Sequence, residues 1–114
     1  MTLVIVCGGR GYTDTERVFA ELDKVYAAKP DLFIIHGGAA GADQRAAEWA
    51  ASRGVPCAEV PAHWNYFGKK AGPTRNGWML RLKPAGVVAF PGGDGTADCV
   101  AQARIAGVPV KEIK

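Results

Sequence analysis

The chain has 114 residues, of which 48% are hydrophobic and 22% are charged. This length suits one domain and is too short for two, and the composition excludes a disordered chain because it supplies enough apolar side chains for a core. The formal net charge of +3 permits an anionic partner but is too small to indicate nucleic acid by itself.

Three cysteines, Cys7, Cys57 and Cys99, are spread along the chain. Two of them lie in apolar runs, which predicts buried free thiols in a reducing compartment. No Cys or His spacing typical of a metal site occurs, so neither a metal nor a cofactor is expected. The apolar run near the N-terminus follows no basic segment and is too short to span a membrane, which favours a cytoplasmic protein without membrane contact.

Apolar, β-branched runs alternate with segments of helical periodicity from the first residues onward. Residues 3–7, LVIVC, predict a buried strand, since a half-exposed strand would alternate with polar residues. A helix is expected from Thr13, where Thr13 and Glu16 have the spacing of a capping box and an apolar stripe follows. Residues 31–38 predict a second buried strand, and residues 41–54 an alanine-rich helix ended by its last glycine.

The second half of the chain continues this alternation. Residues 55–62 predict a weaker strand, and the polar and aromatic residues 63–73 predict a loop. The remaining predicted elements are, in order, a helix over 74–83, a buried strand over 86–90, a helix over 96–107 and an edge strand over 108–113.

Five strands that alternate with helices imply a parallel sheet with helices on both faces, because parallel strands need long, right-handed crossovers. The predicted fold class is therefore α/β, a doubly wound, parallel five-stranded sheet in a single domain of residues 1–114. We expect the strand order 3-2-1-4-5, with 2-1-3-4-5 as the alternative. All helix N-termini then gather at the carboxyl edge of the sheet, where ligands bind near the switch in strand order.

Three junctions at that edge are rich in glycine: CGGRGYTD, HGGAAGAD and FPGGDGTAD, after the first, second and fourth predicted strands. Helix N-termini expose unpaired N–H groups, and glycine removes the Cβ that would keep a phosphate away from them. The pattern predicts a phosphate-bearing ligand, although tight turns in a small domain are the alternative. Neither a dinucleotide fingerprint nor a Walker motif is present. The candidate glycines are Gly8, Gly9, Gly37, Gly38, Gly41, Gly92, Gly93 and Gly95.

Arg75 is the principal candidate among the side chains. It shares helical spacing with Trp78, Met79 and Leu82, which should direct its guanidinium along the carboxyl edge toward residues 91–96. There an arginine can bind a phosphate through two parallel hydrogen bonds. The alternative is a guanidinium that only reaches solvent or pairs with an acid of that loop.

Other polar residues extend the predicted site. Asp43 and Thr96 should face inward from the first turns of their helices, so Asp43 either holds ribose hydroxyls or caps its helix. Arg10, in the first loop, is a second candidate for the phosphate. Asp94 is the acid of the third loop.

A basic stretch follows three aromatic residues. Residues 69–83 carry five basic side chains and no acid, after Trp64, Tyr66 and Phe67. Such a stretch could hold a base by stacking or bind single-stranded nucleic acid. A solvated loop above a small aromatic cluster is the commoner outcome, so nucleic acid is not the favoured partner. The lone His36 and His63 are assigned no chemistry.

Self-association is also expected, as a symmetric homodimer or a higher homo-oligomer. A chain of this length offers a shallow site, whereas ligand pockets normally bury most of their ligand, often at an interface. Two helices present small residues that a self-complementary pairing could use. These are Ala46, Ala47, Ala50 and Ala51 with Trp49, and Ala101 with Ile105. The alternative is that these helices pack closely on their own sheet.

The ordered set HGGAAGAD, AGPTRN and FPGGDGTAD resembles the small, single-domain proteins of the SLOG superfamily, especially the YspA-type branch of bacteria and phages. The superfamily is named for DprA and the Lonely Guy enzymes. The resemblance covers nearly the whole chain and implies a Rossmann-like fold and a nucleotide or related ligand. Lonely Guy enzymes are phosphoribohydrolases that cut the N-glycosidic bond of nucleoside monophosphates.

The enzyme motif of that family is Pro-Gly-Gly-x-Gly-Thr-x-x-Glu, preceded by an Arg-Lys pair. Arg75 matches its arginine, but Asn76 replaces the lysine and Cys99 replaces the glutamate. A neutral thiol cannot stabilise positive charge at the anomeric carbon. The missing carboxylate would have to come from Asp43, or from Asp98 if the start of its helix were rotated.

The resemblance and the residues together predict a protein that binds a nucleotide or a nucleotide-derived ligand, as a sensor or sequestering module. A nucleoside 5′-monophosphate phosphoribohydrolase is the first alternative. A DNA-associated accessory protein is the second.

Overall fold

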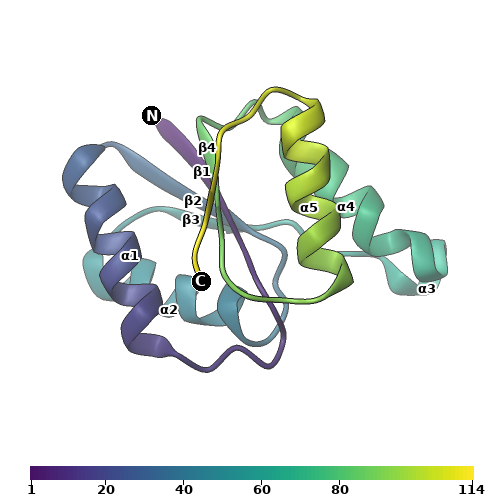
Figure 1. The fold of residues 1–114 in the computed structure, drawn as a ribbon, viewed down its shortest axis with the longest axis horizontal. Coiled ribbons are helices and arrows are strands. Elements are labelled where there is room, and N and C mark those ends of the chain that lie inside the picture. The colour runs from purple at the N-terminus through teal and green to yellow at the C-terminus, as the bar shows by residue number, and fades with distance from the viewer.

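Five parallel strands form one sheet in the order β3-β2-β1-β4-β5 (Figure 1). The structure is a computed structural model that describes residues 1–114. The strands are β1 (Thr2–Cys7), β2 (Leu32–His36), β3 (Cys57–Glu59), β4 (Gly86–Ala89) and β5 (Val110–Glu112). The expected order 3-2-1-4-5 is confirmed. The strand order switches between β1 and β4, where ligands bind in open α/β sheets.

Helices cover both faces of the sheet, with α1 and α2 on one side and α4 and α5 on the other (Figure 1). Val4 and Val6 of β1 pack toward α1 and α2, whereas Ile5 and Cys7 pack toward α4 and α5. Because both faces are buried, β1 needs no polar alternation. The helices are α1 (Thr15–Ala28), α2 (Ala42–Arg53), α3 (Trp64–Phe67), the 3₁₀ turn η1 (Gly68–Lys70), α4 (Ala71–Arg81) and α5 (Asp94–Ile105).

The start of α1 differs from the prediction. Asp14, rather than Thr13, is the N-cap, and its Oδ1 accepts a hydrogen bond from the backbone N–H of Arg17 at 3.0 Å. The predicted capping box of Thr13 and Glu16 is therefore wrong by one position. Aspartate is at least as favourable an N-cap as threonine. Because Asp14 directly follows Thr13, the sequence alone did not distinguish the two positions.

The segment between β3 and β4 is more helical than expected. The predicted loop over 63–73 contains α3, η1 and the first turn of α4. Pro73 lies in that first turn, where a missing N–H costs no helical hydrogen bond. The expected stripe also ends early: Met79 is buried, but Leu82 lies beyond α4 and is 49% exposed. The buried face of α4 instead includes Asn76, at the i, i+3 position before Met79.

Most of the α2 residues expected at a dimer interface are buried within the protein. Ala46, Trp49 and Ala50 are fully buried in the core between α1, α2 and the sheet, and the indole N–H of Trp49 donates to Asp23 at 2.8 Å. These three residues therefore pack on their own sheet, as in the alternative, whereas Ala47 is half-buried and Ala51 is exposed. Ile105 of α5 is 88% exposed, and the homodimer stays a prediction.

Two of the three thiols are buried, as predicted: Cys7 and Cys99 are enclosed, and Cys57 is exposed. None of the helices combines the length and apolar character that a membrane crossing requires.

Candidate functional site

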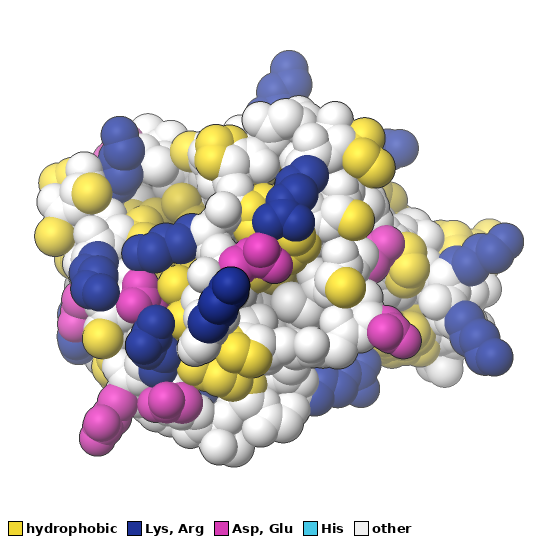
Figure 2. Space-filling model, in the orientation of Figure 1, with side chains coloured by type: hydrophobic (Ala, Val, Ile, Leu, Met, Phe, Trp, Pro, Cys, Tyr) yellow, Lys and Arg dark blue, Asp and Glu magenta, His cyan; other side chains and the backbone are white.

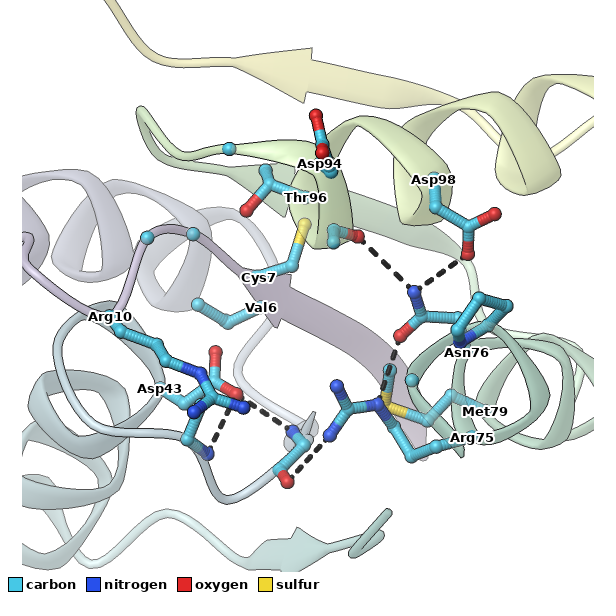
Figure 3. A pocket seen from close by; sticks show the side chains of 18 of the residues that line it. Val6, Cys7, Arg10, Asp43, Arg75, Asn76, Met79, Asp94, Thr96 and Asp98 are labelled. Atoms are coloured by element: carbon cyan, nitrogen blue, oxygen red, sulfur yellow. Dashed lines mark hydrogen bonds between the residues drawn. The ribbon is translucent and has the colours of Figure 1, made fainter. Parts of the chain in front are cut away.

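A pocket of about 480 Å³ opens at the carboxyl edge of the sheet, within the size range of small-molecule sites (Figure 3). Parallel pairing aligns Cys7 with Ala89 and Ile5 with Ile35, so the loops after β1, β2 and β4 emerge side by side. All three loops and α4 line the pocket. The predicted residues that it gathers are Gly8, Gly9, Arg10, Gly37, Asp43, Arg75, Asn76, Gly93, Asp94, Gly95, Thr96 and Asp98. Gly38, Gly41 and Gly92 lie outside its lining.

Several glycines bring the loops together rather than face a ligand. A Cβ on Gly41, whose φ is 77°, would collide with the carbonyl oxygen of Gly9, and one on Gly8 would collide with Ala42. A Cβ on Gly92 would collide with Thr96, and the N–H of Gly9 donates to the carbonyl of Pro91 at 2.9 Å. The predicted role of glycine in admitting a phosphate does not apply to these positions, which hold three loops in backbone contact.

Gly93 and Gly95 have the opposite character. Nothing lies within 4 Å of the position that a Cβ would take on either residue. Gly93 is the N-cap of α5, no side chain caps the helix, and the amide of Ala97 bonds to the carbonyl of Gly93. The backbone amides before Ala97 in the first turn of α5 have no partner in the helix and are left to water or to a ligand. This end of α5 is therefore accessible to an anion.

Asp43 combines burial with a free acceptor. It is only 5% exposed, and its Oδ2 accepts hydrogen bonds from the backbone amides of Gly37 at 3.1 Å and Ala39 at 3.2 Å. Its Oδ1 has no partner although it is buried. Burial raises the pKa of this carboxyl above its ordinary value. The hydrogen bond from the amide of Ala39 and the charges nearby lower the pKa, but their effect is smaller. A buried acceptor without a partner is costly, so Asp43 is poised to accept a donor from a ligand.

His36, to which the sequence assigned no chemistry, supports the same loop. Its Nδ1 accepts a hydrogen bond from the amide of Gly38 at 2.9 Å. An imidazole nitrogen accepts only when it carries no proton, so Nδ1 is unprotonated here. His36 and Asp43 thus bind three consecutive amides, those of residues 37, 38 and 39.

Arg75 lines the pocket but does not contact the loop that the spacing predicted. Its Nη1 donates to the carbonyl of Gly37 at 2.7 Å, and its Nε donates to Oδ1 of Asn76 at 3.0 Å. Figure 3 shows the guanidinium extending from α4 toward the loop after β2. It forms no ion pair with Asp94, and its Nη2 makes no hydrogen bond within the protein. One edge of the guanidinium is therefore available to an anion.

Asn76, rather than Arg75, contacts the start of α5. Its Nδ2 donates to the carbonyl of Gly95 at 3.2 Å and to Oδ2 of Asp98 at 2.9 Å (Figure 3). Gln102 also donates to that oxygen of Asp98, at 2.7 Å. Asp98 lines the pocket from a regular helix. The start of α5 therefore need not be rotated for Asp98 to reach the site, contrary to the expectation from the sequence. The bond between Gln102 and Asp98 could have been predicted from the sequence, because the two residues are neighbours on a helix at i, i+4.

Cys99 faces away from the pocket. It is 1% exposed and packs in the core beneath α4 and α5, whereas Cys7 lines the pocket. The neighbouring Cys99 thiol and burial both raise the pKa of Cys7, which stays a thiol at neutral pH. The neighbouring Cys7 thiol lowers the pKa of Cys99, whereas burial raises it. Neither thiol offers a carboxylate-like acceptor to the pocket.

Arg10 and Trp64 form a stacked pair beside the site. The guanidinium carbon of Arg10 lies 5.6 Å from the centroid of the Trp64 ring, a cation–π geometry, and Trp64 is 47% exposed. Behind it, His63 and Phe67 pack against Trp78, as expected for a small aromatic cluster. On the face in Figure 2, basic side chains are interspersed with acidic ones and do not form one continuous patch.

Comparison with known proteins identifies the family. The family described as YspA, cpYpsA-related SLOG matches residues 2–67, which is more than half of the chain. The chain belongs to this SLOG family. The resemblance drawn from the sequence motifs is thereby confirmed. This SLOG protein is also 36% identical to Gene 61 protein of Mycobacterium phage D29, over 96% of its own length and 94% of the relative.

Two solved structures share the fold of this SLOG protein. The X-ray structure of TM1055 superposes with a TM-score of 0.76 at 22% identity, covering 96% of this chain and 72% of that one. DNA processing protein A (DprA) from Streptococcus pneumoniae also gives 0.76, at 20% identity. The match covers the whole of this chain but half of DprA. At these identities the likeness establishes the Rossmann-like fold alone.

Proposed function

We propose that this SLOG protein binds a nucleotide or a nucleotide-derived ligand in the carboxyl-edge pocket, as a sensor or sequestering module. The observation that carries the proposal is Oδ1 of Asp43, a buried acceptor without a partner in the pocket that also contains the uncapped start of α5. A nucleoside phosphate supplies what both features need, because its sugar hydroxyls are donors and its phosphate is an anion.

The charges of the pocket favour such a ligand over a simple anion. Three acidic and three basic side chains line it, so their formal charges cancel: Asp43, Asp94 and Asp98 against Arg10, Lys69 and Arg75. Inorganic phosphate alone would meet little net attraction. A ligand that also donates hydrogen bonds to the acids interacts favourably with both the basic and the acidic groups. We therefore assign the phosphate to the amides of Gly93–Thr96 and Nη2 of Arg75, and the sugar hydroxyls to Asp43.

The Asp43→Asn variant tests this assignment. We expect it to bind nucleoside 5′-monophosphates and ribose 5-phosphate roughly ten- to hundredfold more weakly, because a hydrogen bond to a charged acceptor contributes about 1.5–3 kcal/mol. Isothermal titration calorimetry measures the loss. Affinity of the wild type should also fall as the pH is lowered through the pKa of Asp43, a component that the variant lacks.

Glu16→Gln is the matched control, since it removes an exposed carboxylate on α1, outside the pocket. Thermal unfolding of each variant shows whether the fold is retained. An Asp43→Asn protein that is folded and binds as tightly as the wild type would refute the role of Asp43. Failure of the wild type to bind any sugar phosphate would refute the proposed function itself.

A second candidate function is nucleoside monophosphate phosphoribohydrolase, and the position of Asp98 favours it. Asn76 and Gln102 hold this carboxylate at the pocket, where it could stabilise positive charge at an anomeric carbon. We nevertheless expect little or no release of free base from nucleoside monophosphates, because Cys99 stands at the glutamate position of the Lonely Guy motif and faces the core. Chromatography of the incubated mixture measures this. Turnover by the wild type that Asp98→Asn abolishes would establish the enzyme instead of the binder.

A further inference from the structure

We propose that the base of the ligand occupies a second, adjoining pocket, and that this pocket selects guanine. The inference rests on the proposed function and adds the identity of the base. The second pocket has a volume of about 290 Å³. Residues that line both pockets include Gly37, Ala39 and Arg75, together with the stacked Arg10 and Trp64. The two pockets are therefore neighbouring parts of one site that meet at these side chains.

The order of features along this site matches the order of parts in a nucleotide. The anion-accessible start of α5 belongs to the first pocket only. Asp43 also lines the first pocket, and its Oδ2 binds the amides of Gly37 and Ala39, the two loop residues shared with the second pocket. A ligand with its phosphate at α5 and its sugar at Asp43 would extend its base across this loop, into the second pocket.

Trp64 offers that base a stacking surface. Its ring lines both pockets, remains 47% exposed, and already has a planar cation, the guanidinium of Arg10, over its face. Flat π-systems and guanidinium groups occupy the same position on an indole ring. A base can therefore replace Arg10 on Trp64, and the displaced guanidinium remains beside the pocket.

Glu59 supplies the selectivity. It lies at the end of β3 and lines the second pocket, and its carboxylate makes no hydrogen bond or ion pair with another residue. Gly38 permits this placement, because a Cβ there would collide with the Glu59 carboxylate. An ionised carboxylate has two adjacent acceptors and no donor. Guanine alone among the common bases presents two adjacent donors, N1–H and the 2-amino group, whereas adenine and cytosine place a ring acceptor next to their amino group.

Calorimetry with three nucleotides and one sugar phosphate tests this proposal. For the wild type we expect GMP to bind roughly tenfold or more tightly than IMP, which lacks the 2-amino group, and than AMP. In Glu59→Gln the preference for GMP should disappear, while the affinity for ribose 5-phosphate stays unchanged. Glu16→Gln again serves as the matched control. Trp64→Ala should weaken GMP binding roughly tenfold and leave ribose 5-phosphate binding intact.

The outcomes separate this inference from the proposed function. Equal affinities for GMP, IMP and AMP, or a preference that survives Glu59→Gln, would overturn the assignment of guanine, while binding of ribose 5-phosphate would still support the sugar and phosphate site. If neither ribose 5-phosphate nor any nucleotide binds, both proposals fail. Both substituted side chains are exposed, so the variants are expected to fold.

Discussion

Loss of Arg75 should weaken nucleotide binding about as strongly as loss of the Asp43 carboxylate. We expect Arg75→Ala to reduce the affinity for nucleoside 5′-monophosphates roughly ten- to hundredfold, since a charge-assisted hydrogen bond to phosphate contributes about 1.5–3 kcal/mol. The free edge of the guanidinium, at Nη2, is the group expected to make this bond. Calorimetry with the same nucleotide and salt concentration measures it.

Two further variants make the result specific. Arg81→Ala removes an arginine from the exposed end of the same helix, outside the pocket, and should leave affinity unchanged. Arg75→Lys keeps a charge but not the planar fork, so it should recover only part of the loss. The bonds from Gly37 and Ala39 to Asp43 keep the neighbouring loop in place when Arg75 is removed. Unaltered affinity in Arg75→Ala would exclude this arginine from the phosphate site.

The largest expected effect on stability comes from Gly41→Ala. Gly41 has φ 77° and ψ −125°, a conformation open almost only to glycine, and its added Cβ would meet the backbone oxygens of Gly9 and Arg10. Backbone strain and the clash together should lower the free energy of unfolding by about 2–5 kcal/mol. That is a large fraction of the stability of a small domain. Urea denaturation measures the change.

Gly54→Ala provides the comparison within the same helix. Gly54 ends α2 with φ 68° and ψ 27°, the left-handed helical region, and nothing lies within 4 Å of its Cβ position. Gly54→Ala should lower the free energy of unfolding by about 1–2 kcal/mol, because alanine is disfavoured in the left-handed conformation. Losses of equal size in the two variants would show that the close approach of Gly41 to the loop after β1 contributes nothing to stability.

The sheet was predictable because each buried strand can be recognised from the residues of its own segment. Uninterrupted apolar runs such as residues 3–7 indicate strands covered on both faces, and alternation with helices then leaves few topologies. The segment before α4 was not predictable in this way. Trp64–Phe67 has too few residues for a helical period, and Pro73 suggests a loop although it is tolerated in the first turn of α4.

Within the site, the sequence indicated which residues gather but not what each one contacts. Asp43 and Arg75 were placed at the pocket from helical spacing and the position of their helices in the fold. The bond from Arg75 to Gly37, and the role of Asn76 in holding Asp98, depend on the distance between α4 and its neighbours. Glu59 was missed because nothing in its own segment marks it, and only the fold brings it beside Gly38.

The contacts among Gly8, Gly9, Gly41 and Gly92 also bear on the kinetics of recognition. Loops in backbone contact cannot move independently, so the amides at the start of α5 and the acceptor of Asp43 keep their positions before a ligand arrives. Little conformational entropy then has to be lost on association. Related ligands should associate at similar rates, and selection among them should be expressed in how long each one stays bound.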